Sequence, residues 1–201
     1  MTLNIIITGV GGQGNVLASQ ILGRAAVQNG LKVTIGETFG LSQRGGAVMS
    51  HVRLSGEKRV GPIIPPNTAH IIAGLEPLET LRIVLEYGNE ESVFIVNSRP
   101  IYPLNVIAGD VEYPEPERIR DILMKSGSKL FWLEATDLAV KLGGPIMLNM
   151  IVLGALCSLP DMPVAIGDIK KILKDIFAGS KLDPNYDALD IGRRLIQSYE
   201  N

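Results

Sequence analysis

The chain contains few of the side chains that bind metals or form disulfides. Among its 201 residues there are one cysteine, Cys157, and two histidines, His51 and His70. A single thiol forms no intrachain disulfide, and it provides neither a cysteine-based zinc site nor the thiolates of an iron–sulfur cluster. We therefore expect no metal site here, and any metal centre of a redox system that includes this protein must be on another chain. Because Cys157 lies in an apolar segment, we expect a buried, unreactive thiol.

Familiar catalytic motifs are missing as well. The sequence has no Gly-x-Ser-x-Gly element, and its few cysteine and histidine residues offer no convincing pairing of a nucleophile with a base. The glycine-rich segment near the start of the chain is not followed by Gly-Lys-Ser or Gly-Lys-Thr, which excludes a P-loop. We assign no catalytic residue to this chain.

The sequence also lacks a strong net charge and a long apolar run. The formal net charge is −2 and no run of Lys or Arg occurs, so we expect neither nucleic acid nor a membrane surface as a partner. The longest apolar segment, Ile146 to Leu159, is too short to span a bilayer, and we expect a helix in the core or at a subunit interface. The chain begins with a strand pattern and no signal-peptide pattern, so we expect a cytoplasmic protein.

The most distinctive pattern that is present lies in the first twenty residues. Residues 3–8 form an apolar, β-branched run typical of a strand buried on both faces, and apolar residues at helical spacing follow from Val16. Between them the glycines fit the spacing G-x-G-x-x-G of the dinucleotide fingerprint, in which backbone N–H groups at the helix start favour an anion. The residues of this segment are Gly9, Gly11, Gly12, Gln13 and Gly14.

Two interpretations of this glycine segment stay open. The glycines fit a phosphate-binding turn, and they fit equally well a strand-to-helix turn that binds nothing. We expect the bulky polar side chain of Gln13 to lie beside any ligand, which is unusual for a plain dinucleotide site. Glu37 closes the next predicted strand at roughly the place where an acidic residue binds the ribose of a nicotinamide cofactor.

A second polar, glycine-rich loop follows that strand. It can form an anion cradle of backbone N–H groups and a guanidinium group, or it can be a flexible connection with a solvated arginine. Its residues are Ser42, Gln43, Arg44, Gly45 and Gly46.

The remaining pattern predicts a single domain over residues 1–201, with an α/β, Rossmann-like three-layer fold and a mostly parallel sheet. No repeat, low-complexity tract or linker divides the chain. We expect His51 to be half-exposed on a strand. The other predicted elements are helices over 76–86, 117–124, 135–142, 164–176 and 189–199, an edge strand at 105–107, and a segment 59–64 that pairs back on the preceding strand.

The two glycine-rich loops together carry a resemblance to a known family. Gly9 to Gly14 resembles the Gly-x-Gly-Gly-Gln-Gly opening of the gamma-type domain of the 2-oxoacid:ferredoxin oxidoreductases, and Ser42 to Gly46 resembles the Gln-Arg-Gly-Gly loop of the same domain. Further similar positions follow in the same order along most of the chain: Glu37, the strand with Arg53, Val96-Asn97-Ser98, Asn149 and Leu153-Gly154-Ala155. This pair of motifs is far more specific than the glycine fingerprint alone.

The resemblance implies a subunit of a complex that oxidatively decarboxylates a 2-oxoacid to an acyl-CoA and reduces ferredoxin. It implies a hetero-oligomer in which a larger catalytic subunit carries thiamine diphosphate (TPP) and [4Fe-4S] clusters, coenzyme A is a co-substrate, and this chain holds no cofactor and is inactive alone. Free-standing subunits of the indolepyruvate enzymes are the most similar, and those of the pyruvate and 2-oxoglutarate enzymes are close.

The family does not assign a catalytic role to either loop. We hypothesise that both loops meet at the carboxyl ends of the first strands, where they face the partner's active centre or hold the phosphates of coenzyme A. One alternative is a stand-alone NAD(P)- or flavin-dependent oxidoreductase that uses Gly9, Gly11, Gly14 and Glu37. Another is a small scaffold whose glycines bind nothing.

Overall fold

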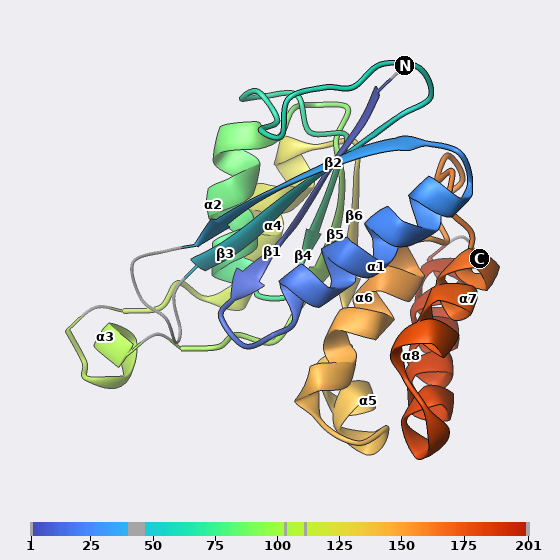
Figure 1. Ribbon diagram of the computed structural model, residues 1–201. Coiled ribbons are helices and arrows are strands. Elements are labelled where there is room, and N and C mark those ends of the chain that lie inside the picture. Colours follow the sequence, from blue (N-terminus) through green and yellow to red (C-terminus); the bar gives the residue numbers. More distant parts are fainter. Residues whose placement is uncertain (1, 40–46, 103, 111, 200–201) are drawn as a thin grey trace.

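The computed structural model describes residues 2–39, 47–102, 104–110 and 112–199, and within them the chain forms a six-stranded sheet with helices on both faces (Figure 1). The strands lie in the order β2-β3-β1-β4-β5-β6. Their bounds are β1 Thr2–Val10, β2 Lys32–Phe39, β3 Ala47–Ser55, β4 Ile71–Gly74, β5 Val93–Asn97 and β6 Lys129–Leu133. The predicted α/β three-layer fold is confirmed.

One strand of this sheet runs against the others. β3 is antiparallel to both of its neighbours, β1 and β2, whereas β1, β4, β5 and β6 pair in parallel. The predicted unit of strand, helix and strand is formed by β1, α1 (Asn15–Gln28) and β2, but β3 is hydrogen-bonded between its two strands. The sheet is therefore mostly parallel in direction, with an order that local patterns do not specify.

The two faces of the sheet have separate cores. Ile5 and Ile7 of β1 pack on the side of α1 and α6, while Ile6 packs on the opposite side. This alternation explains the uninterrupted apolar run of β1, because a strand covered on both faces has no side that needs to be polar. α1 and α6 (Leu148–Leu156) cover the first face, with α7 (Ile166–Ile176) and α8 (Leu182–Gln197) outside them, and α2 (Pro77–Tyr87) and α4 (Pro116–Ser126) cover the second (Figure 1).

The contact between α6 and α8 depends on two glycines. A Cβ atom on Gly154 would lie 2.2 Å from the carbonyl oxygen of Leu189, and one on Gly192 would lie 2.0 Å from that of Ile151. The two helix backbones therefore touch directly. All nine residues of α6 are buried, so its apolar sequence reflects core packing, and the predicted helix at 146–159 is shortened by a 3₁₀ turn, η1 (Pro145–Met147).

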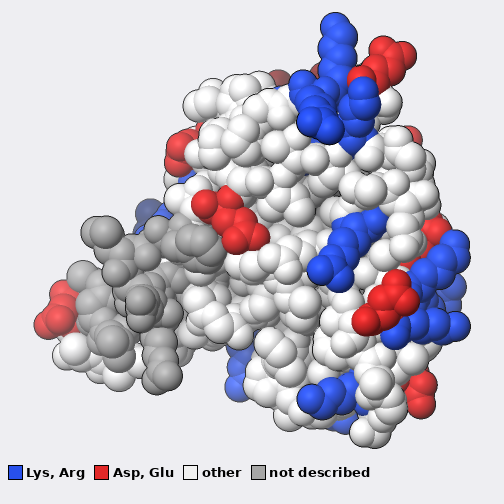
Figure 2. Space-filling model, in the orientation of Figure 1, with Lys and Arg blue, Asp and Glu red and all other residues white. Residues whose placement is uncertain are grey.

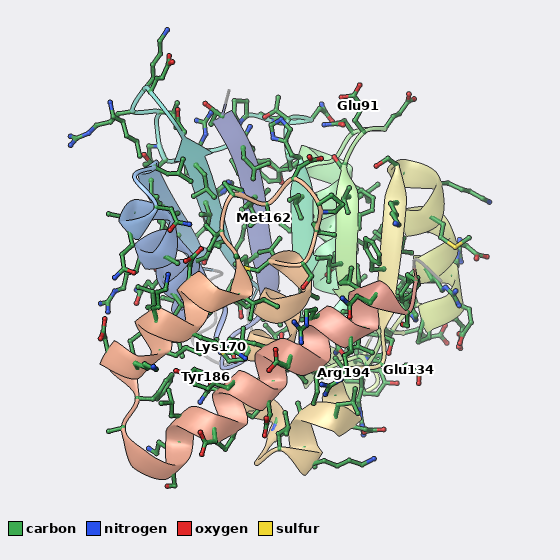
Figure 3. The ribbon with its side chains drawn as sticks, turned by 90° about the vertical axis from the view of Figure 1, so that its right-hand side faces the viewer. Glu91, Glu134, Met162, Lys170, Tyr186 and Arg194 are labelled. Carbon is green, nitrogen blue, oxygen red and sulfur yellow. The ribbon has the colours of Figure 1, made fainter. Side chains whose placement is uncertain are left out.

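α7 and α8 are joined by polar contacts near their exposed side. The hydroxyl of Tyr186 donates to the backbone oxygen of Lys170 at 3.0 Å, and the Lys170 ammonium group lies 2.7 Å from the carboxylate of Asp190. Figure 3 shows Lys170 and Tyr186 on these two neighbouring helices. α8 begins at Leu182, earlier than the predicted start at 189, because Pro184 lies in the first turn, where a missing N–H breaks no helix hydrogen bond.

Three other expectations are wrong. Residues 104–107 form a short helix, α3 (Leu104–Ile107), and no edge strand. Residues 59–64 form no strand, because Arg53 donates from Nη1 to the backbone oxygens of Gly61 and Ile63 and holds the segment across the sheet. His51 is buried, and its Nδ1 accepts the backbone N–H of Ile64 at 3.3 Å.

The remaining helices follow their predicted positions. α2 and α4 are helices near the expected bounds, as are α5 (Thr136–Lys141) and α7, and a second 3₁₀ turn, η2 (Gly179–Lys181), precedes α8. In the part of the chain that the structure describes, no helix is long and apolar enough to cross a membrane. On the face seen in Figure 2, basic and acidic side chains are scattered among uncharged ones.

Candidate functional site

The glycine segment forms the turn between β1 and α1. β1 ends at Val10, and α1 starts at Asn15 after a turn in which Gly12 has φ +98° and Gly14 has φ +84°. Both values lie in the left-handed region, which costs glycine little and other residues more. Gly12 and Gly14 therefore suit this strand-to-helix turn, which begins at the carboxyl end of β1.

Gln13 does not extend toward a ligand, contrary to our expectation. Its side chain is 9% exposed and turns inward: Oε1 accepts the backbone N–H of Val10 at 2.7 Å, and Nε2 donates to the backbone oxygen of Leu75 at 2.9 Å. A Cβ atom on Gly9 would lie 2.4 Å from that Oε1. Gln13 is therefore an internal brace of the turn, and Gly9 provides the space for it.

Side chains from distant segments also hold the turn. Asn149 at the start of α6 donates from Nδ2 to the backbone oxygen of Gly14 at 3.3 Å, and Asn15 donates to that of Val48 at 3.1 Å. A Cβ atom on Gly14 would lie 2.3 Å from the Asn149 amide nitrogen. The sequence motif named Asn149 without a role, and the structure places it directly against the glycine turn.

Asn97, at the end of β5, extends this network beneath the turn. Its Nδ2 donates to the backbone oxygen of Leu75, the same oxygen that Gln13 contacts, at 3.3 Å. Its Oδ1 accepts the hydroxyl of Thr136 at 3.2 Å. Sequence reasoning did not single out Thr136, and the only available signal was its place directly after a predicted strand.

A cleft of about 580 Å³ opens beside the glycine turn, and we call it the glycine-turn cleft. Its walls come from four segments: the turn itself with the end of β1, the loop after β5, α5, and η1 with the start of α6. The lining residues are Val10, Gly11, Gly12, Gln13, Arg99, Pro100, Ile101, Thr136, Val140, Pro145, Ile146 and Leu148. It lies at the carboxyl ends of the parallel strands, where open α/β sheets bind ligands.

The cleft combines one cation with an apolar rim. Arg99 is exposed and pairs with Asp137 at 2.6 Å, an exposed ion pair of the kind that contributes little to stability. Three large apolar side chains of the lining stand open to solvent: Ile101 is 42% exposed, Val140 52% and Ile146 46%. Arg99 and the glycine turn both line the cleft, and a guanidinium group and backbone N–H groups are the kinds of group that bind anions.

The other predicted site residues do not all gather here. Glu37 lies on β2 opposite Ser50 of β3, and Ser50 lies opposite Ile7 of β1. Glu37 is thus two strands from β1, or roughly 10 Å at the usual strand spacing, and not on the adjacent strand that a nicotinamide site uses. Ser42, Gln43, Arg44, Gly45 and Gly46 lie outside the described residues, so their approach to the cleft stays a prediction.

No chemically reactive group lines the cleft. Cys157 is buried, and burial together with Asp168 raises the pKa of its thiol to about 12. His51 lies on the α2 side of the sheet against Tyr87, and burial lowers the pKa of its imidazole. Within the described ranges, no group of three or more His, Cys, Asp or Glu side chains could hold a metal ion.

A family model for pyruvate ferredoxin/flavodoxin oxidoreductases matches residues 4–195, nearly the whole chain. The chain belongs to this family. Its curated relatives include the indolepyruvate oxidoreductase subunit IorB of Archaeoglobus fulgidus, 38% identical over 96% of this chain and 94% of that protein. The IorB of Pyrococcus horikoshii is 36% identical over 98% of both chains. The pyruvate synthase subunit PorC of Methanothermobacter marburgensis is 27% identical over 94% of both.

Solved structures of family members share the fold. The 2-oxoglutarate:ferredoxin oxidoreductase of Magnetococcus marinus, solved with 2-oxoglutarate, coenzyme A and succinyl-CoA, matches with a TM-score of 0.74 at 22% identity. That match covers 98% of this chain and 31% of the longer one. Pyruvate oxidoreductase subunit PORC of Thermotoga maritima matches with a TM-score of 0.69 at 22% identity over 96% of both chains. The resemblance seen in the sequence motifs is therefore confirmed at the level of family and fold.

Proposed function

We propose that this chain is the small subunit of an indolepyruvate-type 2-oxoacid:ferredoxin oxidoreductase, and that its glycine-turn cleft binds the phosphates of coenzyme A beside the partner's active centre. The higher identity to the IorB relatives than to the PorC relative supports the indolepyruvate type. The complex would convert a 2-oxoacid and coenzyme A to an acyl-CoA and carbon dioxide, with the two electrons passed to ferredoxin.

One observation carries the proposal: the cleft has an anion-binding edge and nothing that reacts. Backbone N–H groups of the turn and the Arg99 guanidinium group suit phosphates, whereas no nucleophile or metal-binding cluster lines it among the described residues. The single cysteine cannot hold an iron–sulfur cluster, which agrees with a complex whose larger partner subunit carries TPP and the clusters. This division of labour is what the family resemblance implies.

The apolar rim supports a partner at the same edge. Ile101, Val140 and Ile146 stand exposed around the cleft, and large apolar side chains are typical of the buried centre of a subunit interface. In the proposed complex, the partner covers these residues, and the thiol end of coenzyme A extends from the cleft into the partner's active centre. Exclusion of water there would protect the acyl intermediate from hydrolysis.

The first test is purification of the complex from its native cells without oxygen, followed by assays with indolepyruvate, pyruvate and 2-oxoglutarate. We expect a larger, cysteine-rich chain with TPP to co-purify, and indolepyruvate to be the preferred substrate. Recovery of the chain without a partner, together with saturable NAD(P)H binding by the lone chain, would overturn the proposal in favour of a stand-alone oxidoreductase.

The second test addresses the cleft. In the reconstituted complex, Arg99→Met should raise KM for coenzyme A about tenfold or more, the usual effect of one lost charge-assisted hydrogen bond, and leave the KM for the 2-oxoacid unchanged. Arg120→Met, at an exposed arginine of α4 on the opposite face, is the matched control. Arg44→Ala tests the second loop in the same way. Unchanged coenzyme A kinetics in both loop variants would remove coenzyme A from this cleft.

A further inference from the structure

Glu76 is a buried carboxylate that contacts three separate segments near the cleft. It is the N-cap residue of α2, two residues after the end of β4, and is 1% exposed. Its Oε2 accepts the backbone N–H of Glu79 at 2.8 Å and caps the first turn of α2. Its Oε1 accepts the hydroxyl of Tyr113 and the backbone N–H of Ile101 at 3.4 Å.

The length of this side chain matters. Helix capping needs one acceptor close to the backbone, and the shorter Asp, Asn, Ser and Thr are the preferred N-cap residues. The additional methylene of Glu76 brings its second oxygen beyond the helix to the loop that follows β5. In the described part of the chain no Lys or Arg forms an ion pair with Glu76, so hydrogen bonds and the α2 N-terminus compensate its burial.

Tyr113 supports the contact between Glu76 and Ile101. Its hydroxyl also accepts the backbone N–H of Leu78 at 3.3 Å, and its ring meets that of Tyr102 edge to face at 5.1 Å. Burial and the hydrogen bond to Glu76 raise the pKa of the phenol well above its ordinary value, so the hydroxyl stays a donor. Ile101 and Tyr102 are thus each contacted from the interior, by Glu76 and by Tyr113 respectively.

The segment held in this way is one wall of the glycine-turn cleft. Arg99, Pro100 and Ile101 line the cleft opposite the turn, and they have no helix or strand hydrogen bonds of their own. Among the described contacts of this segment, Asn97 Nδ2 donates to the backbone oxygen of Arg99 over a long distance of 3.5 Å, and Arg99 forms the exposed pair with Asp137. Among the described residues, Glu76 is a buried acidic side chain that this wall contacts, through the backbone N–H of Ile101.

We propose that Glu76 is a positioning residue that, with Tyr113, fixes the wall formed by residues 99–102 and so sets the width of the glycine-turn cleft. This inference rests on the proposed function for the identity of the ligand, coenzyme A. The wall itself is a property of the chain, and its order can be measured without any ligand.

Two substitutions separate the two roles of Glu76. Glu76→Asp keeps the charge and a preferred cap for α2, but it is too short to reach Ile101 and Tyr113. Tyr113→Phe keeps the ring contact with Tyr102 and removes the hydroxyl. Glu79→Gln is the matched control, because Glu79 is a neighbouring buried carboxylate that pairs with Arg82 and does not contact the wall.

The measurement is amide hydrogen exchange of the full chain, compared between residues 99–102 and the body of α2. We expect Glu76→Asp to speed exchange at the Ile101 amide about tenfold, the factor that one lost hydrogen bond gives, with α2 and the Glu79→Gln chain unchanged. Tyr113→Phe should speed exchange at the same amide to a lesser degree. Wild-type exchange at residues 99–102 in Glu76→Asp, or loss of protection throughout α2, would overturn the inference.

Kinetics of the reconstituted complex complete the test. With the wall loosened, we expect Glu76→Asp to raise KM for coenzyme A several-fold with kcat unchanged, because the cleft must be ordered on binding. Faster exchange at the wall with unchanged coenzyme A kinetics would support the positioning role and contradict the proposed ligand. Slow, wild-type exchange would contradict the positioning role whatever the kinetics show.

Discussion

The side-chain Oε1 of Gln13 lies 2.7 Å from the backbone nitrogen of Val10, inside the turn that joins β1 to α1. The same side chain donates to Leu75 after β4, so one residue connects the glycine turn to the neighbouring parallel strand. In a turn of this kind the ligand is expected to contact backbone N–H groups, and the only long polar side chain is used to hold their geometry. The specific Gly-Gly-Gln-Gly motif is thereby explained by internal structure.

We predict that Gln13→Met destabilises the chain by about 1–3 kcal/mol, because it leaves the buried N–H of Val10 without its partner at nearly constant side-chain volume. Urea unfolding of the isolated chain measures this. Gln20→Met, at an exposed position of α1, is the control and should change the unfolding free energy by less than about 0.5 kcal/mol. Equal stability of both variants would contradict the role of Gln13 as a brace.

The contact of α6 with α8 gives a second prediction. Gly154→Ala should destabilise the chain by about 3 kcal/mol or more, because the added methyl group meets the backbone of Leu189 and neither helix can yield locally. Gly167→Ala in the first turn of α7 meets no atom and should stabilise it by up to about 1 kcal/mol through helix propensity. Thermal unfolding of the two variants should move in opposite directions.

The lowered pKa of His51 predicts how the free energy of unfolding depends on pH. Its pKa is lowered from 6.5, chiefly by burial, with Arg53 acting in the same direction and Glu86 against it. His51 therefore binds a proton more readily in the unfolded chain than in the folded chain. The free energy of unfolding falls as the pH drops below about 6.5. Replacement by Asn keeps an acceptor for the Ile64 N–H but does not titrate.

Urea unfolding at pH 7.5 and at pH 5.5 tests this prediction. The wild-type chain should lose more stability between the two values than His51→Asn does. Equal losses would show that His51 titrates alike in the folded and unfolded chains.

The burial of Cys157 predicts that alkylation of its thiol distinguishes the folded chain from the unfolded chain. Burial raises the pKa of its thiol to about 12, so the reactive thiolate is scarce at pH 8 as well as inaccessible. Iodoacetamide should leave the folded chain unmodified and should alkylate one thiol per chain in urea. Mass spectrometry reports both results, and rapid alkylation of the folded chain would place Cys157 at the surface.

The sequence alone determined the local elements and much of the chemistry. The β1–turn–α1 unit, the core helices and the buried thiol follow from apolar periodicity and from glycine spacing, which depend on neighbours along the chain. The low cysteine count excluded a cluster without any structure, and the pair of glycine-rich motifs identified the family. Asn97 and Asn149 were among the further positions similar to the family, but their roles could not be read from the sequence.

Tertiary structure decided what depends on partners distant in sequence. Strand order is one case. β1, β2 and β3 have similar apolar patterns, so the sequence of each strand does not specify its neighbour, and only the tertiary structure shows β3 between β1 and β2. The direction of Gln13 is another, since its partner Leu75 lies 62 residues away. The cleft combines the turn with Arg99 and Ile146, which no local pattern joins. The proposed role of Glu76 likewise depends on the fold, because the fold brings the backbone N–H of Ile101 and the hydroxyl of Tyr113 to the same carboxylate oxygen.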